Sequence, residues 1–90
     1  MTTGSPALWP IDKCVASIIA AHLHVTVPPG GLSPDAHLAT DLSADPIDQI
    51  EVTLAMEDAF DIAISDDESA ACETIGDWQR LVADRVGNRP

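Results

Sequence analysis

Carboxylates are the most numerous side chains in this sequence that could take part in chemistry. The chain has 15 Asp and Glu residues against 4 Lys and Arg, which gives a formal net charge of -11 at pH 7. No Lys or Arg stands between Lys13 and Arg80, although most of the carboxylates lie in that span. A surface of one sign repels nucleic acid and anionic lipid and attracts basic protein surfaces. We therefore expect protein partners, with no nucleic-acid binding and no membrane insertion. The alternative interpretation is that excess acid only keeps the chain soluble.

The histidines and cysteines form no recognisable catalytic or metal-binding pattern. Cys14 and Cys72 stand alone, without the spacing of a zinc site, and we expect both to be small buried residues. His22 falls on an apolar helical stripe and is expected to be packed, while the other two histidines flank a loop. The acidic run 58–68 lacks the residue order of a calcium loop. We predict no metal site and, because no known catalytic motif occurs, no enzymatic activity.

The elements that must position the acidic residues belong to one small domain. A chain of 90 residues with 46% apolar but only 3% aromatic residues predicts a single aliphatic core. We expect a loose leader over residues 1–9, one domain over 10–87 and a tail over 88–90. No apolar run approaches the roughly 20 residues that cross a bilayer, and the N-terminus does not resemble a signal peptide. The sequence therefore predicts a cytoplasmic protein.

The first half of the domain is predicted to be a helix followed by a long loop. Apolar residues recur at helical spacing from Ile11 onward, with Pro10 suited to the first turn. Residues 24–40 contain Val-Pro-Pro-Gly-Gly and Ser-Pro-Asp, which exclude regular structure over most of that length. A loop this long needs attachment to the core. The expected attachment points are Leu32, Leu38 and Leu42.

Helix-start signals divide the second half into three further helices. Asp45 can cap a helix with Pro46 at its first position, and this helix is expected to run to about Phe60. The sequence Ser-Asp-Asp-Glu at 65–68 has capping-box spacing and predicts a short helix that ends before Glu73. Thr-Ile-Gly-Asp at 74–77 begins the last helix, which is expected to stop near Gly87. We predict an all-α fold, a small four-helix bundle with a long first loop and a short third helix.

Residues 41–48, Asp-Leu-Ser-Ala-Asp-Pro-Ile-Asp, resemble the recognition region of acyl carrier proteins. That family has a signature close to Asp-Leu-Gly-x-Asp-Ser-Leu-Asp, followed by a helix of acidic and aliphatic residues that ends in Glu-x-x-Phe. Ile-Glu-Val at 50–52 and Glu-Asp-Ala-Phe at 57–60 continue the likeness, which covers roughly residues 11–86. The resemblance implies the four-helix fold of that family and a place in fatty-acid or polyketide-type biosynthesis, a part of lipid metabolism.

The likeness fails at the residue that carries the family's chemistry. Acyl carrier proteins attach 4'-phosphopantetheine to the Ser of Asp-Ser-Leu, and the matching residue here is Pro46, which has no hydroxyl. The resemblance would imply that cofactor if a Ser stood there, but with Pro46 we expect none. Ser43, which stands where the family has Gly, offers a hydroxyl three residues upstream as an alternative attachment point.

The resemblance also implies a partner-binding surface on the second helix. Family members use acidic residues there to dock basic patches of synthases, acyltransferases and phosphopantetheinyl transferase. The matching residues here are Asp45, Ile47, Asp48, Glu51, Val52 and Glu57. Val52 and Met56 could each belong to the core or to the contact surface, and the core is favoured for Met56 because it shares the helical face of Val52 and Phe60.

Three functions fit the sequence. The first is a monomeric docking module that keeps the acidic helix without the prosthetic group, as a scaffold, competitor or regulatory subunit. The second is a working acyl or peptidyl carrier that is modified at another hydroxyl such as Ser43. The third, from charge alone, is an acidic mimic that occupies nucleic-acid-binding sites.

Overall fold

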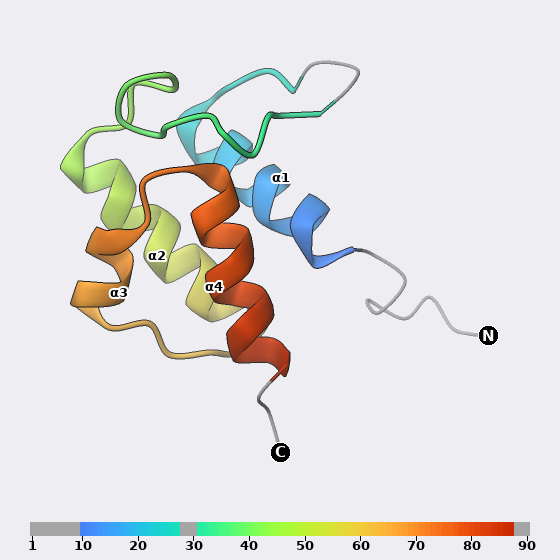
Figure 1. Ribbon diagram of the computed structural model, residues 1–90. Coiled ribbons are helices and arrows are strands. Elements are labelled where there is room, and N and C mark those ends of the chain that lie inside the picture. Colours follow the sequence, from blue (N-terminus) through green and yellow to red (C-terminus); the bar gives the residue numbers. More distant parts are fainter. Residues whose placement is uncertain (1–9, 28–30, 88–90) are drawn as a thin grey trace.

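The computed structural model describes residues 10–27 and 31–87, so the leader and tail expected at the two ends lie outside the described residues. Within these ranges the chain forms four helices and no strand longer than a single bridge: α1 Ile11–Leu23, α2 Pro46–Phe60, α3 Asp66–Ala71 and α4 Ile75–Gly87. The predicted all-α four-helix fold is confirmed (Figure 1).

The four helices differ in how they contribute to the bundle. Helix α1 packs against α4 and α2, and α4 also contacts α2, so these three helices enclose the core. The short α3 packs against α2 (Figure 1). Helix α2 therefore has one side that faces α3 and another that faces the core.

Capping boxes fix where α2 and α3 begin. The Oδ1 of Asp45 accepts a hydrogen bond from the Asp48 N–H at 2.8 Å, and the Oδ2 of Asp48 accepts one from the Asp45 N–H at 3.0 Å. Ser65 and Glu68 make the same reciprocal pair at the start of α3. Such caps satisfy backbone donors that the first helical turn leaves unpaired, and each stabilises the fold by about 1 kcal/mol. The predicted starts of both helices are confirmed.

A similar arrangement begins α4. The Thr74 hydroxyl accepts a hydrogen bond from the Asp77 N–H at 3.1 Å. In return, the Oδ2 of Asp77 accepts from the Glu73 N–H at 3.0 Å and the Thr74 N–H at 3.1 Å. These two backbone hydrogen bonds favour the ionised carboxylate and so lower the pKa of Asp77. The structure thus confirms the start of the last helix that the sequence predicts.

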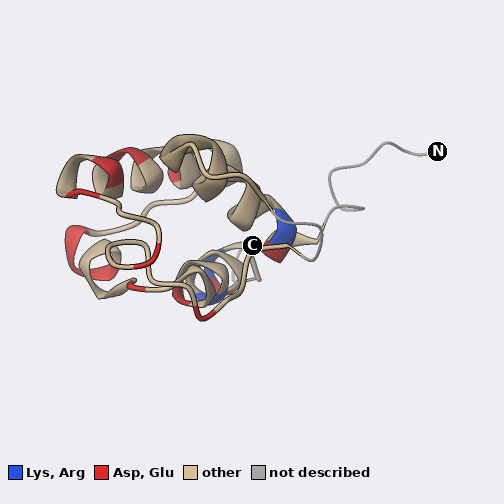
Figure 2. Cartoon of the chain, turned by 90° about the horizontal axis from the view of Figure 1, so that it is seen from above, with Lys and Arg blue, Asp and Glu red and all other residues tan. Residues whose placement is uncertain are grey.

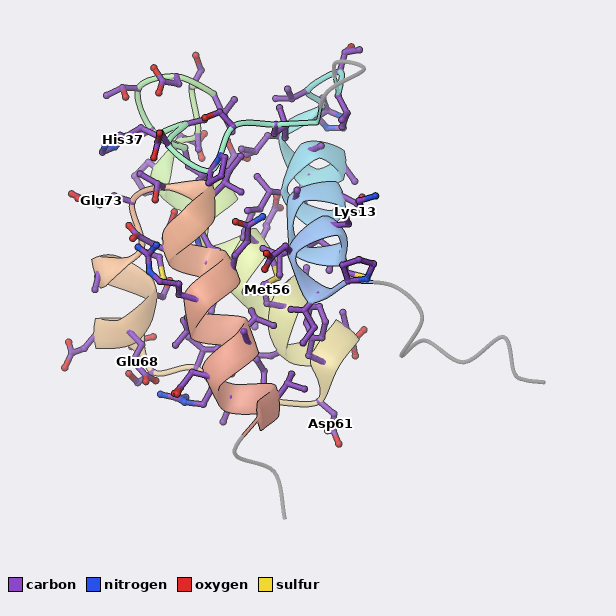
Figure 3. The ribbon with its side chains drawn as sticks, turned by 45° about the vertical axis from the view of Figure 1, so that its right-hand side comes forward. Lys13, His37, Met56, Asp61, Glu68 and Glu73 are labelled. Carbon is purple, nitrogen blue, oxygen red and sulfur yellow. The ribbon has the colours of Figure 1, made fainter. Side chains whose placement is uncertain are left out.

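The core is mostly aliphatic, with Met56, Cys72 and Trp78 as its other buried members and Phe60 packed against it. Met56 lies completely buried between the helices, which confirms its predicted place in the core (Figure 3). Leu38 is also buried, and Leu32 and Leu42 pack against the core from the long loop, as the sequence predicts. The side chains with less than 2% exposure are Trp78, Ile19, Leu38, Met56, Ile75, Val15, Val52 and Val82.

The long loop is held against the beginning of α4. The Gly76 N–H donates to the Pro34 carbonyl at 2.8 Å, and a Cβ at Gly76 would come within 3.1 Å of the same oxygen. The Ile75 N–H donates to the Ala36 carbonyl, and the Leu38 N–H to the Glu73 carbonyl. Because a side chain at residue 76 would press on the backbone of the loop, glycine permits this close approach.

Two of the expectations about histidine and cysteine need correction. His22 is exposed, because the core-facing row of α1 follows Ile11, Val15, Ile19 and Leu23 and leaves His22 off that line. Cys72 is buried as expected, whereas Cys14 is only half-buried. Burial, and then the negative charge of Asp77, raise the pKa of the Cys72 thiol to about 11, although Arg80 opposes this shift.

Ser43 adopts a backbone conformation that favours glycine. Its φ is 59°, in the left-handed region, and its side chain is exposed. A residue with a Cβ is less stable in that region by roughly 1–2 kcal/mol, so a glycine at this position stabilises the folded state. Glycine also has more conformational freedom in the unfolded chain, which cancels part of this stabilisation. We predict that Ser43→Gly raises the free energy of unfolding by up to about 1 kcal/mol in urea titrations. The control Ser17→Gly, inside α1, should lower it. Equal losses in the two variants would contradict this account.

The two thiols should differ in reactivity. At pH 8 the raised pKa keeps Cys72 in the neutral form, which is a poor nucleophile, and its side chain is buried. We predict that iodoacetamide alkylates Cys14 first in the folded protein and reaches Cys72 only when urea unfolds it. Intact mass with peptide mapping measures both rates. Alkylation of Cys72 as fast as that of Cys14 under native conditions would show that the site around Cys72 opens.

Candidate functional site

Pro46, which the sequence resemblance matches to the family's attachment serine, lies at the beginning of α2. Pro46 is the first residue of the helix, directly after the cap Asp45, and it is exposed. The proline ring suits this position because the first helical residue has no intrahelical partner for an N–H. Residue 46 is therefore open to another protein, but a proline offers no oxygen or other nucleophile for a covalent bond.

The alternative hydroxyl is also exposed but belongs to a different element. Ser43 lies in the loop before α2, in a turn closed by a hydrogen bond from the Ala44 N–H to the Leu38 carbonyl at 2.8 Å. Its positive φ is set by that turn rather than by the helix. A transferase that recognises the start of α2 would meet this hydroxyl outside the helix, on the preceding loop.

Three of the predicted docking residues are exposed on or beside α2. Asp45, Ile47 and Glu51 all face solvent, and the side chain of Ile47 has 65% exposure. Asp45 and Glu51 place negative charge at the beginning of the helix and in its second turn. An apolar side chain thus stands among carboxylates on the outer side of α2.

Two other predicted docking residues are partly used by the fold itself. Asp48 is half-buried and completes the cap of Asp45. Glu57 is half-buried too, and its Oε2 accepts a hydrogen bond from the Ile64 N–H at 2.9 Å, which ties α2 to the segment before α3. Both carboxylates still contribute negative charge near the surface, but their side chains are held in place.

Val52 does not belong to the surface. Its side chain has 0% exposure and lies in the core cluster with Met56. It is on the opposite side of α2 from the exposed Ile47 and Leu54. The helical period explains the error, since Val52 and Met56 are one turn apart and share the face that packs against the other helices. The prediction that Val52 contacts a partner is therefore wrong.

Two exposed apolar residues on α2 were not singled out by sequence reasoning. Ile50 has 59% and Leu54 has 58% exposure, and together with Ile47 they form a row at spacing i, i+3 and i+7. The sequence places them in one wide apolar stripe with Val52, although the structure divides that stripe into two sides. The available signal was that apolar residues occur all around this helix, which indicates a second buried or contacted face.

The apolar row borders a groove between α2 and α3. Its walls include Ile50 and Leu54 from α2, and Ile64 and Ala70 from the α3 side. Below them, the hydroxyls of Thr53 and Ser69 lie 2.6 Å apart and Gln49 Nε2 donates to the Ser69 carbonyl at 2.9 Å. We call this hollow the α2–α3 groove. It is an apolar surface feature with a polar floor.

Carboxylates are numerous around this region, and the described Lys and Arg residues belong to α1 and α4. Figure 2 shows that the acidic residues gather on α2, α3 and the loops, and that the basic residues lie on α1 and α4. Lys13 points away from α1 into solvent (Figure 3). Arg80 pairs with Asp77, and Arg85 pairs with Glu68 and donates to the Ala63 carbonyl at 2.7 Å. The field outside α2 is therefore negative.

The described residues hold no cluster of His, Cys, Asp and Glu suited to bind a metal ion. Among the helices of these residues, none combines the length and the apolar character that crossing a membrane requires.

Known proteins similar to this chain include a family and a solved structure. Residues 15–82 match the family described as phosphopantetheine attachment site. A solved structure from Mycobacterium tuberculosis, of a protein assigned as an acyl carrier protein, is similar with a TM-score of 0.73 and 27% sequence identity, over 82% of this chain and 96% of that one. The fold, the capped second helix and the family match agree, and the chain therefore belongs to the phosphopantetheine-attachment-site family, the family of acyl carrier proteins.

Proposed function

We propose that this protein is a carrier-like docking module of fatty-acid or polyketide-type biosynthesis that carries no 4'-phosphopantetheine at residue 46. It binds carrier-dependent enzymes through the acidic outer face of α2 and delivers no substrate of its own. The observation that carries this proposal is Pro46 at the first position of α2, where the sequence resemblance places the attachment serine of the family.

The chemistry of attachment supports this interpretation. In the transferase reaction a serine oxygen forms a bond to the β-phosphorus of coenzyme A, the serine proton goes to a base, and adenosine 3',5'-bisphosphate leaves. Pro46 has neither the oxygen nor the proton. The helix start is intact at the same time, because the Asp45 and Asp48 cap forms around the proline. The position has thus lost its chemistry while keeping the geometry that a partner would recognise.

The charge distribution supports docking to basic enzymes. Glu51 and Asp58 are exposed on α2, and no Lys or Arg occurs in α2 or α3. Such a surface raises the rate of encounter with a Lys- and Arg-rich patch, and the effect falls as salt screens it. The net charge of -11 also opposes self-association, so the module is expected to act as a monomer. Bound to an enzyme in this way, it would act as a scaffold, competitor or regulatory subunit.

A second candidate is a working acyl or peptidyl carrier with its arm on Ser43. The specific observation in its favour is that the Ser43 hydroxyl is exposed just before the start of α2. Its position on a turn with positive φ argues against it, because the transferase would have to accept a hydroxyl that is not on the helix.

Intact mass distinguishes the two candidates. The protein is incubated with coenzyme A and a broad-specificity phosphopantetheinyl transferase, beside the variants Pro46→Ser and Ser43→Ala. We predict no change in mass for the natural sequence and for Ser43→Ala, and a gain of one phosphopantetheine for Pro46→Ser. Circular dichroism should show the same helical signal in the natural protein and both variants. Residue 46 is exposed, and the cap of α2 does not use the side chain of that residue.

A gain of one phosphopantetheine on the natural sequence that disappears in Ser43→Ala would establish the second candidate instead. A different result would be that Pro46→Ser is not modified although its helical signal is intact and an ordinary acyl carrier protein is modified in parallel. This result would show that more than the missing hydroxyl separates this surface from its relatives.

A further inference from the structure

The largest fully buried side chain of the described residues is a tryptophan on α4. Trp78 lies one turn into that helix, has 0% exposure and belongs to the core cluster with Val52 and Met56. A buried aromatic side chain removes roughly 150–250 Å² from water. The indole ring therefore takes up a large share of a small core that is otherwise mostly aliphatic.

Trp78 lies at the end of the bundle where α2 also begins (Figure 1). The Leu38 carbonyl accepts a hydrogen bond from the Ala44 N–H at 2.8 Å, just before α2. The Leu38 N–H donates to the Glu73 carbonyl at 3.0 Å, just before α4. One loop residue thus joins the chain in front of both helices. A group attached at residue 46 would start from this end of the molecule.

The indole N–H of Trp78 has no hydrogen-bond partner among the described residues, and its Nε1 atom is buried. A buried donor without a partner destabilises the folded state, and most buried polar groups in proteins are paired. A phenylalanine or leucine here would avoid that cost but would fill less space. Tryptophan at this position is therefore better explained by the volume of its ring than by its polar atom.

Polar contacts close a second route into the interior, between α2 and α3. The hydroxyls of Thr53 and Ser69 lie 2.6 Å apart. Gln49 Nε2 donates to the Ser69 carbonyl at 2.9 Å and to the Cys72 carbonyl at 3.4 Å. An alkyl chain that entered here would break these hydrogen bonds and leave polar groups unpaired, which is costly in an apolar environment. The floor of the α2–α3 groove therefore resists entry from that side.

We propose that Trp78 is a specificity residue, whose ring excludes an alkyl chain from the interior of the bundle. Packed protein interiors have few voids larger than a water molecule, so a chain can enter only where the side chains leave room. An acyl group held near the start of α2 then stays outside, against solvent or a partner enzyme. The inference goes beyond the docking function, because it holds whether an arm is attached at residue 46, at Ser43 or at neither.

A smaller side chain in place of Trp78 should open the interior. Large-to-small substitutions in a core leave a cavity, because the surrounding structure relaxes only in part. An apolar cavity of about 150 Å³ stays dry and binds small apolar molecules. Trp78→Ala and Trp78→Val remove much of the ring volume, whereas Trp78→Phe keeps most of it and removes only the unpaired N–H. These variants separate the effect of volume from that of the polar atom.

The test attaches a chain at residue 46 and measures whether the interior holds it. The transferase loads Pro46→Ser from acetyl- or octanoyl-coenzyme A, alone and combined with each Trp78 variant or with Val82→Ala. Val82 is the matched control, because it is also completely buried and lies one turn further along α4. Calorimetry gives the melting temperature of each acyl form, and circular dichroism checks that each variant keeps its helices.

We expect the octanoyl and acetyl forms to melt at the same temperature in Pro46→Ser alone and in its combinations with Trp78→Phe and Val82→Ala. With Trp78→Ala or Trp78→Val, the octanoyl form should melt at least about 4 °C above the acetyl form, because its methylenes leave water for the cavity. NMR should then show nuclear Overhauser effects between the octanoyl chain and the methyl groups of Val52 and Met56.

A second measurement needs no transferase. Octanol is titrated into the natural protein and into Trp78→Val with Pro46 kept, and the methyl signal of Met56 is followed by NMR. We expect a saturable shift in Trp78→Val and none in the natural protein. This measurement does not depend on modification of Pro46→Ser or on binding to any enzyme. Failure of the inference is therefore distinguishable from failure of the proposed function.

Other results would overturn the inference. A higher melting temperature for the octanoyl form of Pro46→Ser, or a saturable octanol shift in the natural protein, would show that a chain enters beside Trp78. Both measurements remain decisive even if the smaller Trp78 variants do not fold. No octanol shift and no difference between acyl forms in a folded Trp78→Val would show that another group closes the interior. An equal gain in Val82→Ala would show that the position of the lost volume does not matter.

Discussion

The packing of Val52 and Met56 in the core determines which side chains of α2 face outward. A rotation of the helix by one residue against the core would turn each outer residue by about 100°. With the observed packing, Ile47, Glu51 and Leu54 face solvent, and the capping box between Asp45 and Asp48 fixes where the helix begins. The outer face of α2 depends on these two local arrangements.

The same cap explains how α2 can begin with Pro46 and keep its fold. The carboxylates of Asp45 and Asp48 each accept a hydrogen bond from the backbone N–H of the other residue. Nothing in the cap therefore depends on the side chain at residue 46. A proline at the first helical position removes no intrahelical hydrogen bond and has a suitable φ. Function at this position can therefore change independently of stability, and the acidic surface is free to keep a role in binding.

Most of the fold could be predicted from the sequence because its signals are local. The capping boxes at Asp45, Ser65 and Thr74, together with the Pro- and Gly-rich loop, place the helix starts within one residue of those observed. Leu38 as the anchor of the loop follows from its position between breakers and helix, and the structure confirms it. These features are set by neighbouring residues, so the sequence contains them directly.

The surface could be predicted only in part, since exposure depends on which helices pack against α2. The sequence cannot show that α3 contacts Gln49 and Thr53 on α2 but leaves Ile50 and Leu54 exposed. Nor can it show that Val52 faces the core, and the prediction therefore grouped Val52 with the docking residues. The same limit explains His22, whose place on or off the core depends on the rotation of α1 against its neighbours. The groove arises from tertiary packing between two helices and has no motif of its own.

The most direct test of the central claim is a map of the docking face in solution. Isotope-labelled protein is titrated with a carrier-dependent condensing enzyme, and the backbone amide signals are followed by NMR at low and high salt. The account predicts that signals of Ile47, Glu51, Leu54 and Asp58 shift or broaden first, and that the effect diminishes as salt rises. Signals around Ser17 on α1 should stay unchanged. Perturbation centred on α1, or no perturbation at an enzyme concentration that affects an ordinary acyl carrier protein, would contradict docking through α2.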